Sequence, residues 1–108
     1  MNYPQTPLAD FFGGYFNQDW AMDSPTWEGI VDLFLRDEPS DAELNAISRE
    51  LKVLAETEDE LALASRLLRE LGCFYRAIGP TGSTQAWLLE LRARIEAELK
   101  ARQRHLRE

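Results

Sequence analysis

The sequence predicts an all-α fold, a single-domain bundle of four to five helices within residues 1–108. Apolar residues recur along most of the chain at the spacing of amphipathic helices. Serine, threonine, proline and glycine stand where such helices would begin and end, and almost no segment alternates as a strand does. With 108 residues, of which 44% are hydrophobic, the chain is expected to bury one core and to leave little room for a deep cleft.

A dense aromatic block opens the sequence, with five aromatic residues between positions 11 and 20. A first helix is predicted from Pro7 to about Phe12, because the Gly13-Gly14 pair favours a turn. Two roles are open for the block: it closes the core, or it holds a short polar rim in a fixed shape for a partner. We expect the core to take most of the rings, together with two tryptophans further along: Phe11, Phe12, Phe16, Trp27 and Trp87.

A second helix is predicted to begin at Ser24, which is a good N-cap. Pro25 suits the first helical position, because an N–H would have no partner there. Pro39 is expected to end this helix, since the residue before a proline is pushed out of the helical region. The apolar residues at helical spacing between these points form one stripe: Trp27, Ile30, Val31, Phe34 and Leu35.

Two capping boxes, in which a hydroxyl and a glutamate bond each other's backbone amides, are predicted at Ser40–Glu43 and Thr57–Glu60. The tight junction at 55–57 favours an antiparallel hairpin of the two helices, with one bent helix as the alternative. Gly72 is expected to terminate the fourth predicted helix. The third helix would bury Leu44, Ile47, Leu51 and Leu54, and the fourth Leu61, Ala64, Leu67, Leu68 and Leu71.

Residues 73–78 are expected to be a brief extended segment, followed by a loop with Gly-Pro and Thr-Gly pairs. Ser83 or Thr84 would then cap a long final helix. The mostly charged tail, residues 100–108, is expected to project or to fray. The inner face of the final helix carries Trp87, Leu88, Leu91, Ile95 and Leu99.

The net charge of −7 is unevenly distributed. Residues 1–72 hold 15 acidic and 5 basic side chains, whereas residues 73–108 hold 4 acidic and 7 basic ones. An acidic body repels nucleic acid and attracts a basic protein, although acidic surface also keeps a small protein soluble. No segment approaches the ~20 apolar residues of a membrane span, and the amino end lacks a secretory signal, so we expect a cytoplasmic protein without membrane contact.

Catalysis is not expected from this sequence. The one histidine, His105, stands in the charged tail with no acid or nucleophile beside it, and the one cysteine, Cys73, is expected to be a small buried hydrophobe. The sequence has neither a calcium-binding aspartate ladder nor a phosphate-cradling glycine loop. We therefore predict no enzyme, no cofactor and no metal site.

Two functions other than catalysis are considered at this point. The basic residues of the last helix suggest nucleic-acid contact, but they alternate with glutamates, which favours pairing on the helix surface. A helical scaffold or homo-oligomerisation module that acts through the last helix is the other function considered, although fewer than three clean heptads are visible. A monomer or a weak dimer is expected.

Four stretches of the sequence resemble one known family. They are Leu8 with Gly13 to Trp20, then Phe34-Leu35-Arg36-Asp37-Glu38-Pro39, then Leu71-Gly72-Cys73 with Tyr75, and finally Ser83 with Ala86-Trp87-Leu88. Together they cover residues 8 to about 97 in order, and they resemble the CdiI class of small helical immunity proteins from bacterial contact-dependent growth inhibition systems. The variable parts are residues 44–69, which show only a helical pattern, and the tail after Leu99.

The resemblance implies an antitoxin without catalysis of its own. Such proteins bind the carboxyl-terminal toxin domain of a large exported effector, often a nuclease, and block its active site. A nuclease that grips phosphates needs a basic surface, so an acidic inhibitor would speed encounter by electrostatic steering. The expected partner is thus a basic toxin domain, and direct nucleic-acid binding is not expected.

The residues that contact the toxin should be acidic and should lie where related proteins differ, since each must reject foreign toxins. Helix capping and solubility are the competing explanations for the same side chains. We expect one acidic rim and a second patch to bind the toxin: Asp19, Asp23, Asp37, Glu38 and Asp41 in the rim, and Glu58, Asp59 and Glu60 in the patch.

Overall fold

The computed structural model describes residues 6–57, 59–75 and 83–107, except for the side chains of residues 57 and 105–107. Every regular element in these ranges is a helix, so the predicted all-α class is confirmed. A short helix, α2, adds to the number predicted. In chain order the helices are α1 (Pro7–Tyr15), α2 (Trp20–Asp23), α3 (Trp27–Arg36), α4 (Asp41–Thr57), α5 (Glu60–Arg69) and α6 (Thr84–Arg107).

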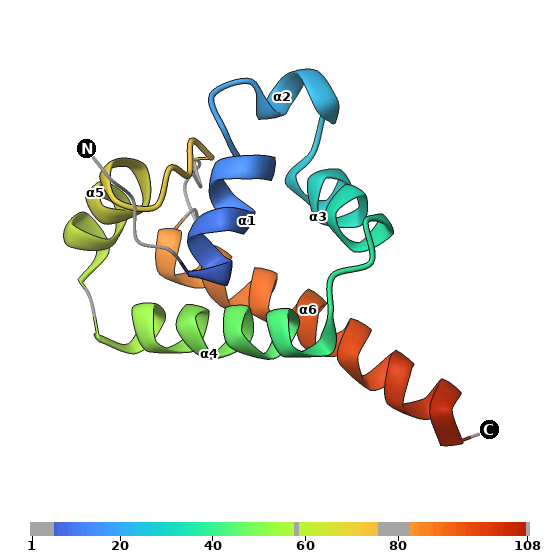
Figure 1. Cartoon of the computed structure of the whole chain (residues 1–108). Helices are drawn as coiled ribbons and strands as arrows, with labels where there is room; N and C mark the ends of the chain where they lie inside the picture. Colours follow the sequence, from blue (N-terminus) through green and yellow to red (C-terminus); the bar gives the residue numbers. More distant parts are fainter. Residues whose placement is uncertain (1–5, 58, 76–82, 108) are drawn as a thin grey trace.

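The packing of α4 against α6 forms the base of the molecule, and α1 lies against α4 (Figure 1). Helix α3 contacts α1, and α5 contacts α6. A buried hydroxyl joins the two base helices: Ser48 donates to Glu96 at 2.6 Å and accepts from Nε of Arg92 at 3.1 Å. The predicted hairpin is wrong, because α5 packs on α6 instead of running back along α4 (Figure 1).

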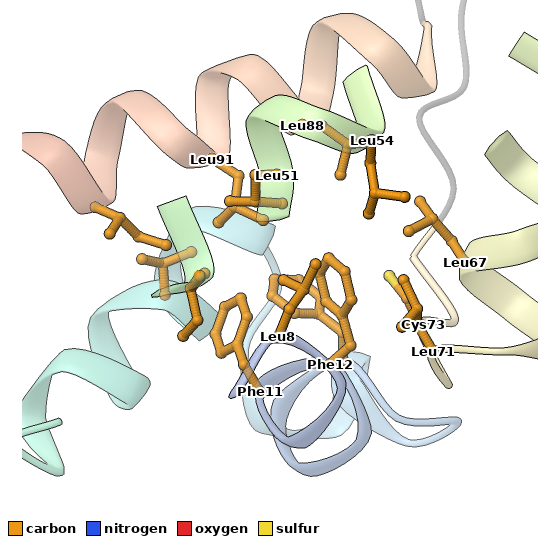
Figure 2. Packing of buried hydrophobic residues seen from close by; sticks show 14 of the residues in the cluster. Leu8, Phe11, Phe12, Leu51, Leu54, Leu67, Leu71, Cys73, Leu88 and Leu91 are labelled. Atoms are coloured by element: carbon orange, nitrogen blue, oxygen red, sulfur yellow. The ribbon is translucent and has the colours of Figure 1, made fainter. Parts of the chain in front are cut away.

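The aromatic block closes the core. Figure 2 shows Leu8, Phe11 and Phe12 of α1 pointing toward leucines of α4 and α6. Phe12 stacks on Trp87 of α6 with ring centroids 6.0 Å apart, and Phe16 meets the same indole edge-on at 5.5 Å. Four of the five rings predicted for the core are buried, whereas the fifth, Trp27, is only half-buried at the edge of the core.

The first helix is longer than predicted, because Gly13 and Gly14 lie inside α1 and do not end it. The amide of Phe16 donates to the carbonyl of Phe12 at 2.8 Å, which carries the helical pattern across both glycines. Packing of Phe11, Phe12 and Phe16 into the core therefore outweighs the modest preference of glycine for a turn.

The caps of α3 and α5 differ from those predicted. Thr26, not Ser24, caps α3 by accepting the Gly29 amide at 3.1 Å, and α3 ends at Arg36 ahead of Pro39. Asp59 caps α5, so the predicted box at Thr57–Glu60 is wrong. The Ser40 hydroxyl does accept the Glu43 amide at 3.1 Å, as half of the first predicted box.

The apolar faces of the later helices are largely as expected. All the predicted inner residues of α4 and α6 are buried. For α5 the prediction is right in part: Leu67 and Leu71 are buried as expected, but Leu63 is buried in place of Leu61, which is 87% exposed, and Ala64 is exposed as well. Gly72 has the expected left-handed conformation, with φ of 68°.

Residues 73–75 form no strand, and the amide of Phe74 bonds the carbonyl of Phe16 at 2.8 Å. The rest of the predicted extended segment, 76–78, lies outside the described residues. Ser83 caps α6 as predicted by accepting the Ala86 amide at 2.9 Å. The tail was expected to project or to fray: its backbone stays helical to Arg107 and projects beyond the other helices (Figure 1).

Candidate functional site

A groove of about 330 Å³ lies where α1 meets the turn between α3 and α4. Its floor is apolar, and its rim carries carboxylates that are exposed to solvent. We call this site the acidic groove. The floor consists of Pro7, Phe11, Phe34 and Pro39, and the rim consists of Asp10, Asp37, Glu38 and Glu43, with Tyr15 between them.

The aromatic floor is held by ring contacts between α1 and α3. The ring centroids of Phe11 and Phe34 are 4.4 Å apart, and Tyr15 meets Phe34 edge-on at 5.1 Å. Phe11 and Tyr15 are four positions apart on α1, so helical geometry places both rings on one face. The floor is therefore an extension of the core to the surface.

One hydrogen bond ties the rim to this floor. The Tyr15 hydroxyl donates to a carboxylate oxygen of Asp37. This bond, with burial and the negative charges of Asp37 and Glu43, raises the pKa of Tyr15 to about 12. The phenol thus stays neutral at physiological pH, and its hydrogen bond orients the Asp37 carboxylate.

Arg102 holds the α3–α4 turn from the far end of α6. Its Nη1 donates to the carbonyl of Pro39 and to a carboxylate oxygen of Asp41, both at 2.8 Å. Its Nε donates to Glu98, one helical turn back, also at 2.8 Å. These bonds to carboxylates raise the pKa of Arg102. The residue is a positioning group, because it fixes the turn that carries the rim.

Glu38 has a strained backbone at the centre of this turn. Its φ is 56°, in the left-handed region that side chains with a Cβ disfavour. The amide of Glu38 bonds the carbonyl of Leu35 at 3.1 Å, and the following Pro39 is held by Arg102. The strained conformation keeps the exposed Glu38 side chain on the rim of the groove.

The structure brings together only part of the predicted rim. Asp37 and Glu38 line the acidic groove, and Asp41 lies beside it with its carboxylate bonded to Arg102. Asp19 and Asp23 are exposed on the α2 segment, which lies apart from the α3–α4 turn (Figure 1).

Two residues of the predicted second patch, Asp59 and Glu60, form hydrogen bonds that hold helix starts. Asp59 caps α5 by accepting the Ala62 amide at 2.8 Å. Glu60 accepts the amides of Thr84 at 2.7 Å and Gln85 at 3.1 Å, and so anchors the start of α6. Glu58 lies outside the described residues.

Three polar residues of the groove were missed as site residues by sequence reasoning: Asp10, Tyr15 and Glu43. The predicted end of the first helix at Phe12 removed Tyr15 from the helix and hid its four-residue spacing from Phe11. Glu43 was assigned to a helix cap. Its backbone amide does donate to the capping hydroxyl of Ser40, but its side chain lines the groove. Asp10 gave no signal beyond its charge.

Charge is unbalanced in the acidic groove, since none of its described lining residues is basic. A second groove, of about 310 Å³ along α6, contains both Arg94 and Glu98 and so has no such imbalance.

Cys73, which lines neither groove, is buried, as expected, and burial raises the pKa of its thiol to about 12. A thiol in that state is not a nucleophile at neutral pH. The side chain of His105 lies outside the described residues.

The family model of the CdiI immunity proteins matches residues 5–95, most of the chain. The chain belongs to the CdiI immunity protein family. The family resemblance drawn from the aromatic block and the three later stretches is thereby confirmed. No curated protein and no solved structure matches the chain.

Membership of the CdiI immunity family assigns the chain to proteins that neutralise a toxin partner. The matched residues include the whole acidic groove but end before Arg102, so the clamp on the turn lies beyond the matched region. Among the described residues, no helix has the length and apolar character to cross a membrane.

Proposed function

We propose that this CdiI-family protein binds and neutralises the carboxyl-terminal toxin domain of its cognate contact-dependent growth inhibition effector, and that this toxin is a nuclease with a basic surface. The acidic groove carries the proposal: four exposed carboxylates line a groove with an apolar floor, and no base among the described lining residues balances them. A basic nuclease surface is the complement of such a site. Asp19 and Asp23 would provide a further contact on α2.

The decisive experiment mixes the purified chain with the toxin domain encoded immediately upstream of it. We expect a complex with submicromolar Kd and loss of the nuclease activity of the toxin. An unaltered toxin activity in the presence of excess chain, or no complex at micromolar concentration, would contradict the proposed function.

Charge reversal tests how the acidic rim contributes. Glu38→Lys combined with Glu43→Lys should slow association and weaken its dependence on salt, because rim charges act mainly on the rate of encounter. Glu56→Lys is the matched control, since Glu56 is exposed on α4 and does not line the groove. Equal association rates for the groove and control variants would remove the acidic groove from the interface.

A further inference from the structure

The acidic groove has features that specify the chemistry of its occupant. We propose that it receives one arginine side chain of the toxin domain, an inference that rests on the proposed function. At about 330 Å³ the groove is near the lower end of ligand pockets, about 300 to 1,000 Å³, so a long side chain suits it better than a folded element.

The charges of the rim favour a cation. Asp10, Asp37, Glu38 and Glu43 all line one small groove, and no ion pair joins any of them to another described residue. Tyr15 reports the same field, since the charges of Asp37 and Glu43 each contribute to the rise of its pKa. A bound cation would relieve repulsion between carboxylates that share the site.

The aromatic floor selects arginine over lysine. A guanidinium is planar, so it can stack on a ring while its five N–H donors reach carboxylates around its edge. An ammonium is a compact and strongly hydrated charge that gains less from such a floor. In the acidic groove the half-buried ring of Tyr15, which packs on the buried rings of Phe11 and Phe34, lines the site together with carboxylates from two different parts of the chain, an arrangement that suits the fork of a guanidinium.

The same chain already contains this arrangement once. The guanidinium carbon of Arg94 lies 5.8 Å from the ring centroid of Trp27, while its Nη2 bonds Asp32 at 3.2 Å. One arginine thus engages an aromatic ring and a carboxylate together on the surface of α3. The acidic groove offers the ring and the carboxylates but has no arginine among its described lining residues, and in this proposal the partner supplies the guanidinium.

A small probe tests the groove without the toxin. N-acetyl-arginine methylamide, titrated into the labelled full chain, should shift amide resonances of residues 10–15 and 34–43 by nuclear magnetic resonance. The lysine analogue should bind at least fivefold more weakly. The Asp10→Asn, Glu43→Gln double variant should lose most of the response, whereas Glu56→Gln should keep it. Equal responses to the two analogues, or a response unchanged in the double variant, would overturn the assignment of arginine.

A second arm uses the toxin domain itself. The Asp10→Asn, Glu43→Gln variant should raise the Kd for the toxin at least tenfold, with Glu56→Gln unchanged and with circular dichroism showing that both variants are folded. Full-strength binding by the double variant would overturn the arginine inference and leave the proposed function standing. Absence of binding by the unaltered chain would sink both. Self-association of the chain that these substitutions abolish would give the groove to a second copy and would likewise overturn the inference.

Discussion

At the scale of single residues, Tyr15 shows how the core and the acidic groove are connected. Its ring packs on Phe34, and its hydroxyl donates to Asp37 on the rim. The bond needs the protonated phenol, so its contribution to stability is complete below the ordinary tyrosine pKa of about 10. That contribution is lost as pH rises through the folded pKa of about 12.

Titration of phenolate absorbance measures this directly. We expect the Tyr15 signal, assigned by comparison with Tyr15→Phe, to appear near pH 12 in the unaltered chain. Asp37→Asn should move it toward about 10, because both the charged acceptor and its repulsion of phenolate are removed. An unchanged Tyr15 pKa in Asp37→Asn would show that the hydrogen bond to Asp37 does not control the pKa of Tyr15.

Glu38 is predicted to lower the stability of the fold through its strained backbone and to support toxin binding through its charge. Glu38→Gly should raise the free energy of unfolding by about 1 kcal/mol, because glycine adopts the left-handed conformation without the Cβ penalty. The same change should weaken toxin binding, since it removes a rim charge. Glu38→Ala is the control that removes the charge but keeps the strain. Chemical denaturation of both variants gives the comparison, and equal stabilities would refute a strained Glu38.

At the scale of helices, apolar periodicity predicted which segments are helical and which faces of α4 and α6 are buried. The sequence prediction was wrong for the end of α1, which was placed at the glycine pair, and for part of the buried face of α5. In α1 the packing of three phenylalanines continues the helix through two glycines, and no local signal encodes that packing. In α5 leucines occur on several faces, so the sequence alone did not decide between Leu61 and Leu63.

These two leucines of α5 form a matched pair for mutation. Leu63→Ala should lower the free energy of unfolding by about 2 to 5 kcal/mol, because it leaves a cavity at a fully buried site. Leu61→Ala should change it by less than about 0.5 kcal/mol, because that side chain is exposed. Urea denaturation of the pair provides the measurement; a larger loss from Leu61→Ala would mean that α5 is rotated.

Glu60 links the start of α5 to the start of α6, and the link should depend on pH. Desolvation raises the pKa of Glu60, but hydrogen bonds from Thr84, Gln85 and Ser83 outweigh it and leave the pKa lowered. A lowered folded pKa gives stability above the unfolded value of about 4.3, and that stability is lost as pH falls through the folded pKa.

Thermal unfolding of Glu60→Gln against the unaltered chain tests the link. The variant should have the lower Tm at pH 7, and the gap should narrow below about pH 4, where the native glutamate is protonated as well. A gap that persists unchanged in acid would mean that the charge of Glu60 is not what anchors α6.

At the scale of the whole molecule, the acidic character of the surface could be predicted, but the acidic groove could not. The groove joins α1 to a turn that comes more than twenty residues later, and the bond from Tyr15 to Asp37 spans 22 positions. Arg102 reaches back 63 positions to Pro39. Composition gives the number of carboxylates, whereas the packing of α1 on α3 decides which of them line the same groove.

The core is predicted to depend on the aromatic block as a unit. Phe12→Ala should lower the free energy of unfolding by about 3 to 5 kcal/mol, because its buried ring contacts Phe11, Phe16 and Trp87. Phe74→Ala, at a ring that is 41% exposed, should cost at most about 1 kcal/mol. Guanidinium denaturation followed by tryptophan fluorescence compares the two, and similar losses would show that α1 does not organise the core.

The clamp by Arg102 also sets an order of events during synthesis. The turn at Asp41 is translated 61 residues before the side chain that holds it. At about 5 to 20 residues per second, that separation corresponds to roughly 3 to 12 s. During this interval the nascent chain has its rim carboxylates but not the guanidinium that fixes their turn. A newly made molecule therefore gains its finished acidic groove only after the distal part of α6 has been translated.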